Sequence, residues 1–172
     1  MLQLLGGVLI LIGSIGIGYA YIEKEQKIIG VTQTWEHMMQ MFISEITYKK
    51  QPLSLACCEI GEKIGGKEGE YLKRIAHRMQ DKGRNTFEKI WCMEWQNYYK
   101  EEKITVEIKK LIKEFGILTG FEDEMIQKKM IEEQLEKWKS MRIKMQQEHG
   151  ERKRLILLLS SGLGVITVLI LW

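Results

Sequence analysis

The sequence predicts an all-α protein, with a six-helix cytoplasmic bundle between an N-terminal and a C-terminal transmembrane helix. Three observations lead to this prediction. Every charged side chain lies between Glu23 and Arg154, so both ends of the chain are apolar. Among 172 residues there is a single proline, Pro52, and proline commonly stops helices. Between the two ends, apolar residues recur every three or four positions, as they do along one face of a helix.

The two apolar ends have the length of membrane spans. A helix rises about 1.5 Å per residue, so roughly 20 apolar residues cross the hydrocarbon core of a bilayer. Residues 1–22 exceed this length, and residues 155–172 reach it if the arginines before them extend to the interface. Gly18-Tyr19-Ala20 has the small-x-small pattern of a signal cleavage site. No basic residue precedes the first run, however, and the run exceeds the usual ~7–15 residues, which favours an uncleaved anchor.

Basic residues flank the charged middle on both sides and predict its orientation. The residues nearest the apolar ends are Lys24, Lys27, Arg152, Lys153 and Arg154. Because such residues stay on the cytoplasmic side, we expect a cytoplasmic middle and two external termini. The predicted segments are an anchor at 1–22, a cytoplasmic bundle at 23–150, and a basic flank with a second anchor at 151–172.

The first three helices of the middle follow from apolar stripes and from the residues that stop them. The first stripe continues from the first anchor and consists of Val31, Trp35, Met38, Met39, Phe42 and Ile46. Pro52 ends this helix. The second stripe consists of Leu53, Ala56, Ile60 and Ile64, and the third of Tyr71, Leu72, Ile75 and Met79. Gly65-Gly66 stops the second helix because glycine adopts positive φ without strain, and Gly83 closes the third.

The last three helices are predicted in the same way. Asn85 is a candidate N-cap for the fourth helix, with Glu88 completing a capping box. The stripe of this helix consists of Phe87, Ile90, Trp91, Trp95 and Tyr98, and that of the fifth of Ile104, Ile108, Leu111, Ile112 and Phe115. The fifth helix ends near residues 116–120, and the sixth starts near Asp123, whose carboxylate suits a helix N-terminus. Its stripe, which can run into the second anchor, consists of Ile126, Met130, Leu135, Trp138, Met141 and Met145.

The sequence contains no recognisable catalytic or metal-binding motif. His37, His77 and His149 are far apart, and adjacent Cys57 and Cys58 lack the CxxC spacing of redox sites. We therefore expect no enzymatic activity, no cofactor or metal, and no small-molecule substrate. The net charge is +3, and the basic residues are interspersed with acidic ones, so they form no basic patch typical of nucleic-acid binding.

Small residues four positions apart occur in both apolar ends. They are Ser14 and Gly18 in the first end, and Ser160 and Gly164 in the second. This spacing lets helix backbones approach closely. The two spans are therefore expected to pack on each other or on copies of themselves, which leaves a homo-oligomer possible.

Two short patterns resemble the stage III sporulation protein AB family of endospore-forming bacteria. The first is Ser44-Glu45-Ile46-Thr47-Tyr48 followed by Gln51-Pro52-Leu53-Ser54-Leu55-Ala56. The second is Gly116-Ile117-Leu118-Thr119-Gly120, followed by Asp123 and Gln127. The order of the parts, an anchor, a helical middle and a terminal anchor, is similar as well. The resemblance implies a fold like the six-helix cytoplasmic domain of type II secretion F proteins and pilus platforms.

The same resemblance implies a non-enzymatic platform in the mother-cell membrane around the forespore. There it would join other channel proteins in a secretion-like channel, and its body would meet a hexameric traffic ATPase, stage III sporulation protein AA. Loops on a rigid scaffold often carry binding residues. The candidate partner-binding residues in the two patterns are Glu45, Tyr48, Asp123 and Gln127.

Two other functions remain open from the sequence. One is a general type II secretion or type IV pilus platform, which a second bundle and a third span would support; this sequence shows neither. The other is an exported helical receptor, if the N-terminus is cleaved. The mass of the mature N-terminus would identify such cleavage.

The predicted orientation can be tested by thiol labelling. The three cysteines, Cys57, Cys58 and Cys92, cannot all pair, and a reducing compartment is the simplest reason. In a variant that retains only Cys92, a membrane-impermeant maleimide should react after cell lysis but not in intact cells. Labelling of intact cells would place the middle of the chain outside.

Overall fold

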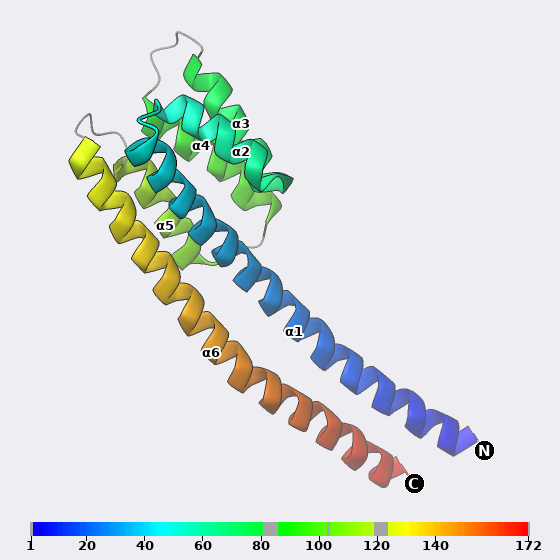
Figure 1. Cartoon of the computed structure of the whole chain (residues 1–172). Helices are drawn as coiled ribbons and strands as arrows, with labels where there is room; N and C mark the ends of the chain where they lie inside the picture. The colour runs from blue at the N-terminus through cyan, green and yellow to red at the C-terminus, as the bar shows by residue number, and fades with distance from the viewer. Residues whose placement is uncertain (1, 81–85, 103, 119–123, 172) are drawn as a thin grey trace. The chain divides into compact units, whose positions relative to one another are not determined.

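The described protein is entirely helical. The computed structural model describes residues 2–80, 86–102, 104–118 and 124–171, with the backbone alone for part of the apolar ends. In these ranges there is no strand, and six α-helices and one π-helical turn follow in order. They are α1 (Leu2–Ile43), η1 (Ser44–Tyr48), α2 (Leu53–Ile64), α3 (Gly66–Gln80), α4 (Phe87–Glu101), α5 (Val106–Leu118) and α6 (Glu124–Leu171) (Figure 1). The all-α prediction with six helices is confirmed.

The chain forms two compact units. Unit 1 consists of Met1–Val31 and Arg142–Trp172, and unit 2 of Thr32–Met141. Helices α1 and α6 contribute to both units. Residues 23–31 and 142–150, which were predicted as part of the bundle, group with the apolar ends.

Within the described residues, no helix is long and apolar enough to cross a membrane. Many side chains of residues 1–15 and 163–172 lie outside the description. The two transmembrane spans therefore stay a prediction.

The connection from α1 to α2 is a wide turn followed by a proline. In η1 the backbone N–H of Lys49 donates to Ser44 O (3.4 Å), and the next turn is closed by Gln51 N–H donating to Glu45 O (3.2 Å). Lys50 has φ 51°, an uncommon value for a residue with a side chain. Pro52 then disfavours helical backbone at the residue before it. As predicted, a new helix begins after Pro52.

Helices α2 and α3 form a tight hairpin. Gly65 has φ 63° and separates the two helices, while Gly66 already begins α3. The backbones also touch at a glycine pair: a Cβ on Gly69 would lie 2.4 Å from Gly61 O, and a Cβ on Gly61 2.8 Å from Gly69 O. Both positions therefore have to be glycine for this crossing.

Some predicted helix ends are shifted or lie outside the described residues. Gly83, Asn85 and Asp123 lie outside the described residues, and Thr86 directly precedes α4. Ile104, predicted on the fifth stripe, lies before α5. The helix starts later because Thr105 Oγ1 accepts a hydrogen bond from Ile108 N–H (3.4 Å), an N-cap contact.

The predicted stripes form the core of unit 2. Buried on α1 are Trp35, Met38, Met39 and Phe42; on α2 and α3 Ala56, Ile60, Tyr71, Leu72 and Ile75; on α4 Ile90, Trp91, Trp95 and Tyr98; on α5 Ile108, Leu111, Ile112 and Phe115; and on α6 Leu135 and Trp138. Other predicted stripe residues are only half-buried: Val31, Leu53, Ile64, Met79, Phe87, Ile104, Met130, Met141 and Met145. Ile126 is exposed, with 45% of its surface accessible. It precedes the first buried residue of α6, Ile131, by more than one turn.

Aromatic rings join the helices at the centre of this core. Trp35 of α1 stacks on Trp138 of α6 with centroids 5.4 Å apart and lies 4.6 Å from Trp95 of α4. Phe115 of α5 lies 4.8 Å from Trp91 and 4.9 Å from Phe42. Tyr71 of α3 stacks on Trp95 with centroids 5.7 Å apart, so five helices share one aromatic cluster.

Gly116 has a packing role that the sequence did not indicate. It was expected in a turn, but it lies inside α5 and is buried against Trp91. A Cβ at this position would be 2.3 Å from Trp91 Cδ1. Trp91 cannot easily retreat, because its indole N–H donates to Ile112 O (2.7 Å).

Replacing Gly116 with alanine should therefore destabilise the protein. Overpacking a core typically costs about 1–3 kcal/mol. Gly150→Ala is the matched control, since Gly150 lies within α6 and has nothing within 4 Å of an added Cβ. That control should be neutral or stabilising by up to about 1 kcal/mol. Denaturant unfolding of the full chain, followed by circular dichroism, gives both values; equal values would show that Gly116 does not contact Trp91.

Candidate functional site

The described parts of the two family-like patterns lie at one end of unit 2. The contact between Phe42 and Phe115 brings the C-terminal ends of α1 and α5 together. Helix α6 runs back along α5, because Glu114 accepts hydrogen bonds from Gln134 Nε2 (3.1 Å) and Lys137 Nζ (2.9 Å). The end of α5 and the start of α6 therefore lie near η1. We call this region, formed by η1, residues 49–52 and the adjoining ends of α5 and α6, the η1 end.

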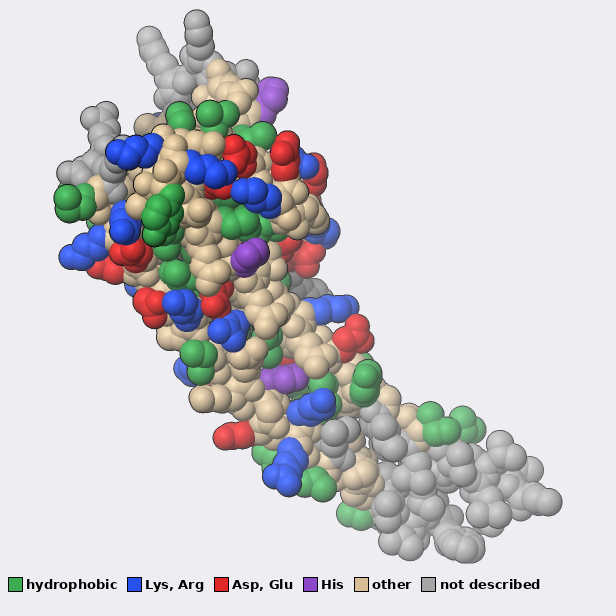
Figure 2. Space-filling view, in the orientation of Figure 1, with side chains coloured by type: hydrophobic (Ala, Val, Ile, Leu, Met, Phe, Trp, Pro, Cys, Tyr) green, Lys and Arg blue, Asp and Glu red, His purple; other side chains and the backbone are tan. Residues whose placement is uncertain are grey.

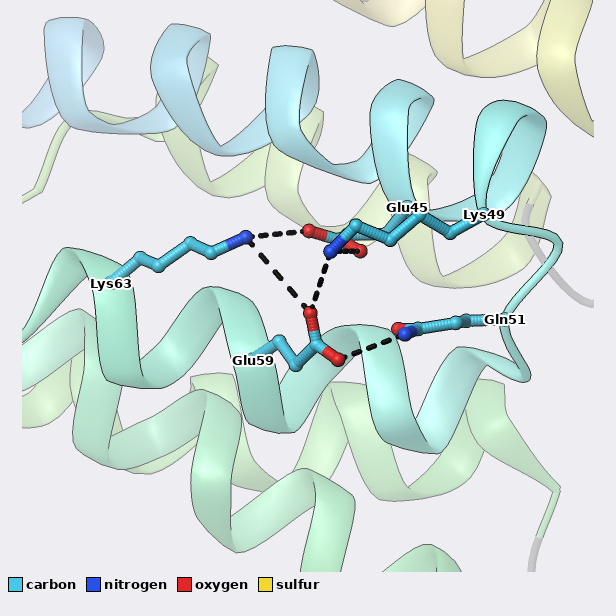
Figure 3. Close-up of polar contacts among 5 residues, drawn as sticks. All are labelled: Glu45, Lys49, Gln51, Glu59 and Lys63. Carbon is cyan, nitrogen blue, oxygen red and sulfur yellow. Dashed lines mark hydrogen bonds and ion pairs between the residues drawn. The ribbon is translucent and has the colours of Figure 1, made fainter.

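A buried carboxylate organises the polar contacts at the η1 end. The side chain of Glu45 is only 2% exposed. Its Oε1 accepts a hydrogen bond from Lys63 Nζ of α2, and its Oε2 forms an ion pair with Lys49 Nζ, both at 2.7 Å (Figure 3). Both lysines are about half exposed. The buried charge is thus neutralised by cations that stay hydrated, which limits the cost of burying it.

Glu59 extends these contacts along α2. It accepts hydrogen bonds from Lys49 Nζ (2.9 Å) and from Gln51 Nε2 (2.8 Å). These bonds, first that of Gln51 and then that of Lys49, lower the pKa of Glu59. The contacts with Glu45 and then Glu59 raise the pKa of Lys49 to about 12. The four charged groups and Gln51 form one connected network, which ties the turn after α1 to α2.

The predicted partner-binding residues differ in their exposure. Tyr48, the last residue of η1, is 79% exposed, as expected for a surface residue. Glu45 was expected to have a partly free side chain, and this is wrong, because the lysine pairs hold it in a buried position. Gln127 is half-buried on α6 and already has an interaction partner. Asp123 lies outside the described residues.

The basic residues predicted to flank the membrane lie in unit 1. Lys27 pairs with Glu23 one turn earlier (3.2 Å). Arg152 contacts Glu25 (3.2 Å) and Glu148 (3.3 Å), while Lys153 and Arg154 are exposed.

Unit 1 also contains contacts that sequence reasoning missed. Glu25 accepts from both His149 Nδ1 (3.0 Å) and Arg152, so this carboxylate joins α1 to α6. Two turns nearer the N-terminus, a Cβ on Gly18 would lie 3.1 Å from Ser160 Oγ. The expected close approach of small residues is confirmed for this pair, whereas the side chains of Ser14 and Gly164 lie outside the description. The lone carboxylate Glu25 between the basic residues Lys24 and Lys27 was the available sequence signal.

The remaining buried charge has a structural partner. Glu94 of α4 is 1% exposed and pairs with Arg78 Nε of α3 at 2.8 Å. Tyr98 donates a short hydrogen bond to Glu68, and burial is the first cause of the raised pKa of this tyrosine. Among the described residues, no group of three His, Cys, Asp or Glu side chains could hold a metal ion. The Glu94–Arg78 and Tyr98–Glu68 contacts join α3 to α4.

Comparison with known proteins establishes the family. The family model for stage III sporulation protein AB matches residues 3–172, and the chain belongs to this family of sporulation proteins. A solved structure of stage III sporulation protein AB has a similar fold, with a TM-score of 0.65 at 18% sequence identity. The similarity covers 72% of this chain and 97% of that chain. A comparison with curated proteins gives no match.

Removing the buried charge of the network should destabilise unit 2. Glu45→Gln keeps the shape of the side chain but leaves Lys49 and Lys63 without their shared anion, and we expect a loss of about 1–3 kcal/mol. Glu62→Gln is the control, because Glu62 is exposed on the same helix as Lys63, and it should change stability by at most about 0.5 kcal/mol. Urea unfolding of the full chain measures both. Similar losses would mean that Glu45 is not held as described.

Acid should weaken the same network. The folded-state pKa of Glu59 is below the ordinary value of 4.5, so its contribution is present above pH 4.5 and is lost as pH falls through the lower folded value. Glu114, whose pKa Lys137 lowers first, should act in the same direction. Unfolding midpoints of the wild type and of Glu59→Gln should therefore converge as pH falls below about 4.5.

Proposed function

We propose that this chain is a non-enzymatic membrane platform of the sporulation machinery. In this proposal residues 1–22 and 155–172 anchor it in the mother-cell membrane around the forespore. The helical body lies in the cytoplasm and docks a hexameric traffic ATPase, stage III sporulation protein AA, within a secretion-like channel. The observation that carries the proposal is the family match over residues 3–172, which includes both apolar ends as well as the helical body.

The distribution of charge supports the membrane part of the proposal. No charged residue occurs in residues 1–22 or 155–172, and basic residues border both. A charged side chain at the centre of a bilayer costs about 2.5–3.5 kcal/mol even on insertion scales, so this absence is what two spans require. Over unit 2, Lys and Arg side chains are intermingled with Asp and Glu on the face shown in Figure 2. Such a surface suits a body that stays in water.

The geometry of unit 2 supports a binding role without catalysis. Its buried carboxylates, Glu45 and Glu94, are each paired with a cation of a neighbouring helix. Such pairs tie helices together and neutralise these two carboxylates. These buried ion pairs therefore have a structural role, and the exposed side chains are the ones available to a partner.

The η1 end is the best candidate for ATPase docking. Tyr48 is 79% exposed beside Lys49, and the ion-pair network fixes the turn that presents it. Tyrosine is a frequent anchor of protein interfaces, because a rigid ring buries much area at little entropic cost. A partner with a hydrophobic recess for the ring would match this surface.

This docking role can be tested with a pair of surface variants. Tyr48 and Val106 have almost equal exposure, 79% and 78%, but Val106 begins α5 and therefore lies at the opposite end of that helix from the η1 end. Tyr48→Ser should lower ATPase binding by at least about 30-fold, the loss of a hot spot worth ~2 kcal/mol, and should reduce the count of heat-resistant spores. Val106→Ser should leave both unchanged.

The readouts are co-purification of the ATPase with the full-length protein and spore counts from the same strains. Both variants should fold and reach the membrane fraction. If Tyr48→Ser retains full ATPase binding and sporulation, the contact does not lie at the η1 end. Recovery of the wild type in the soluble fraction would contradict the membrane part.

A further inference from the structure

Unit 1 contains an apolar groove with a basic end. A cavity of about 590 Å³ is lined by Ile17, Gly18 and Tyr21 of α1 and by Arg152, Leu155, Ile156, Leu159 and Ser160 of α6. This volume lies within the ~300–1,000 Å³ range of ligand sites. Close approach of Gly18 to Ser160 forms part of its wall. Several lining side chains are more than half exposed: Ile17 at 76%, Leu155 at 58% and Leu159 at 64%.

Two basic residues, Arg152 and Lys24, are positioned to contact a ligand in this groove. Arg152 lines the groove, and its guanidinium is held by Glu25 and Glu148 through one N–H of each terminal nitrogen. Because arginine has five donors, others remain for a ligand. Lys24 follows Ile17 by seven residues and Tyr21 by three, so it lies on the same face of α1. Lys24 is exposed, and none of the ion pairs among the described residues involves it.

We propose that this groove binds an anionic phospholipid, with an acyl chain along the apolar lining and the phosphate between Lys24 and Arg152. The inference rests on the proposed membrane location of unit 1. An acyl chain matches a lining of aliphatic side chains that stay exposed in the folded chain, and a phosphate matches a cation at one end only. Basic pockets beside membrane helices on the cytoplasmic side recognise anionic headgroups in this way. A packed apolar helix would match the lining but leave Lys24 without a counter-charge.

Two pairs of residues of the same kind give matched variants. Leu158 and Leu159 are both 64% exposed, but Leu159 lines the groove and Leu158 does not. Leu159→Trp should fill the groove, whereas Leu158→Trp should not. For the headgroup, Lys24→Gln removes a cation on the groove face. Arg154→Gln removes one that lies two residues, about 200°, around α6 from Arg152, away from the groove.

The experiment is native mass spectrometry of the full-length protein, titrated in detergent with dioleoylphosphatidylglycerol or with dioleoylphosphatidylcholine, which share the same chains. The wild type should bind one phosphatidylglycerol more tightly than phosphatidylcholine. Lys24→Gln should weaken phosphatidylglycerol binding about fivefold, the effect of one cation near a lipid headgroup, and Arg154→Gln should not. Leu159→Trp should weaken binding of both lipids, and Leu158→Trp of neither.

Equal effects within either pair would overturn the proposal, as would equal affinity for the two lipids. A lipid-free dimer that Leu159→Trp dissociates would show that a second copy occupies the groove instead. These outcomes are distinct from failure of the proposed function: a protein that binds no lipid here can still fractionate with membranes and recruit the ATPase, and recovery in the soluble fraction would remove the premise.

Discussion

The packing of unit 2 depends on the burial of four tryptophan rings, Trp35, Trp91, Trp95 and Trp138, none of which is measurably exposed. At about 25 cal/mol per Å² and ~150–250 Å² each, burying one ring contributes about 4–6 kcal/mol. Trp91 alone among them has an acceptor for its indole N–H, whereas the described residues offer none to the other three. A lost hydrogen bond of that kind costs about 1–3 kcal/mol, so the apolar area still decides the position of each ring.

Large rings at the centre leave little freedom to the surrounding backbone. Gly116 is required because α5 passes directly over the Trp91 ring, and any side chain there would enter it. Further out, α2 and α3 touch through Gly61 and Gly69, while the pairs of Arg78 with Glu94 and of Tyr98 with Glu68 hold α3 to α4. Small residues and polar pairs thus adjust the outer helices to a spacing that the aromatic core sets.

The helices and their buried stripes could be predicted from the sequence because a helix face is a local property. The spacing of Trp35, Met38, Met39 and Phe42 is enough to place them together on the core side of α1. Contacts between distant segments carry no such spacing. Nothing near Gly116 indicates that Trp91 lies above it, so its glycine resembled a turn residue. The start of α5 was predicted too early for a different reason. Ile104 fits the apolar spacing of the helix, but the side chain of Thr105 caps the helix after it.

At the candidate site, too, the spacing of residues was not enough to predict which side chains are buried. Glu45 and Tyr48 are three residues apart, and in an α-helix such residues share a face. The backbone of η1 is wider than an α-helix, and here Glu45 is buried while Tyr48 is exposed. A prediction that grouped them as surface residues was therefore right for one and wrong for the other. Because of this wider turn, one short segment buries the paired carboxylate of Glu45 and exposes the aromatic ring of Tyr48.

In unit 1, polar and small residues fix how helices α1 and α6 pack against each other. Two helices that meet through leucine and isoleucine alone can slide past each other, because one aliphatic contact replaces another at little cost. Glu25 prevents this, since it accepts from His149 and Arg152 at once and leaving either contact would strand a largely buried carboxylate. The Gly18–Ser160 contact sets the distance between the same helices. A fixed register and a fixed distance are what turn two apolar helices into a groove of defined lining, so the polar residues of unit 1 determine the shape of its apolar surface.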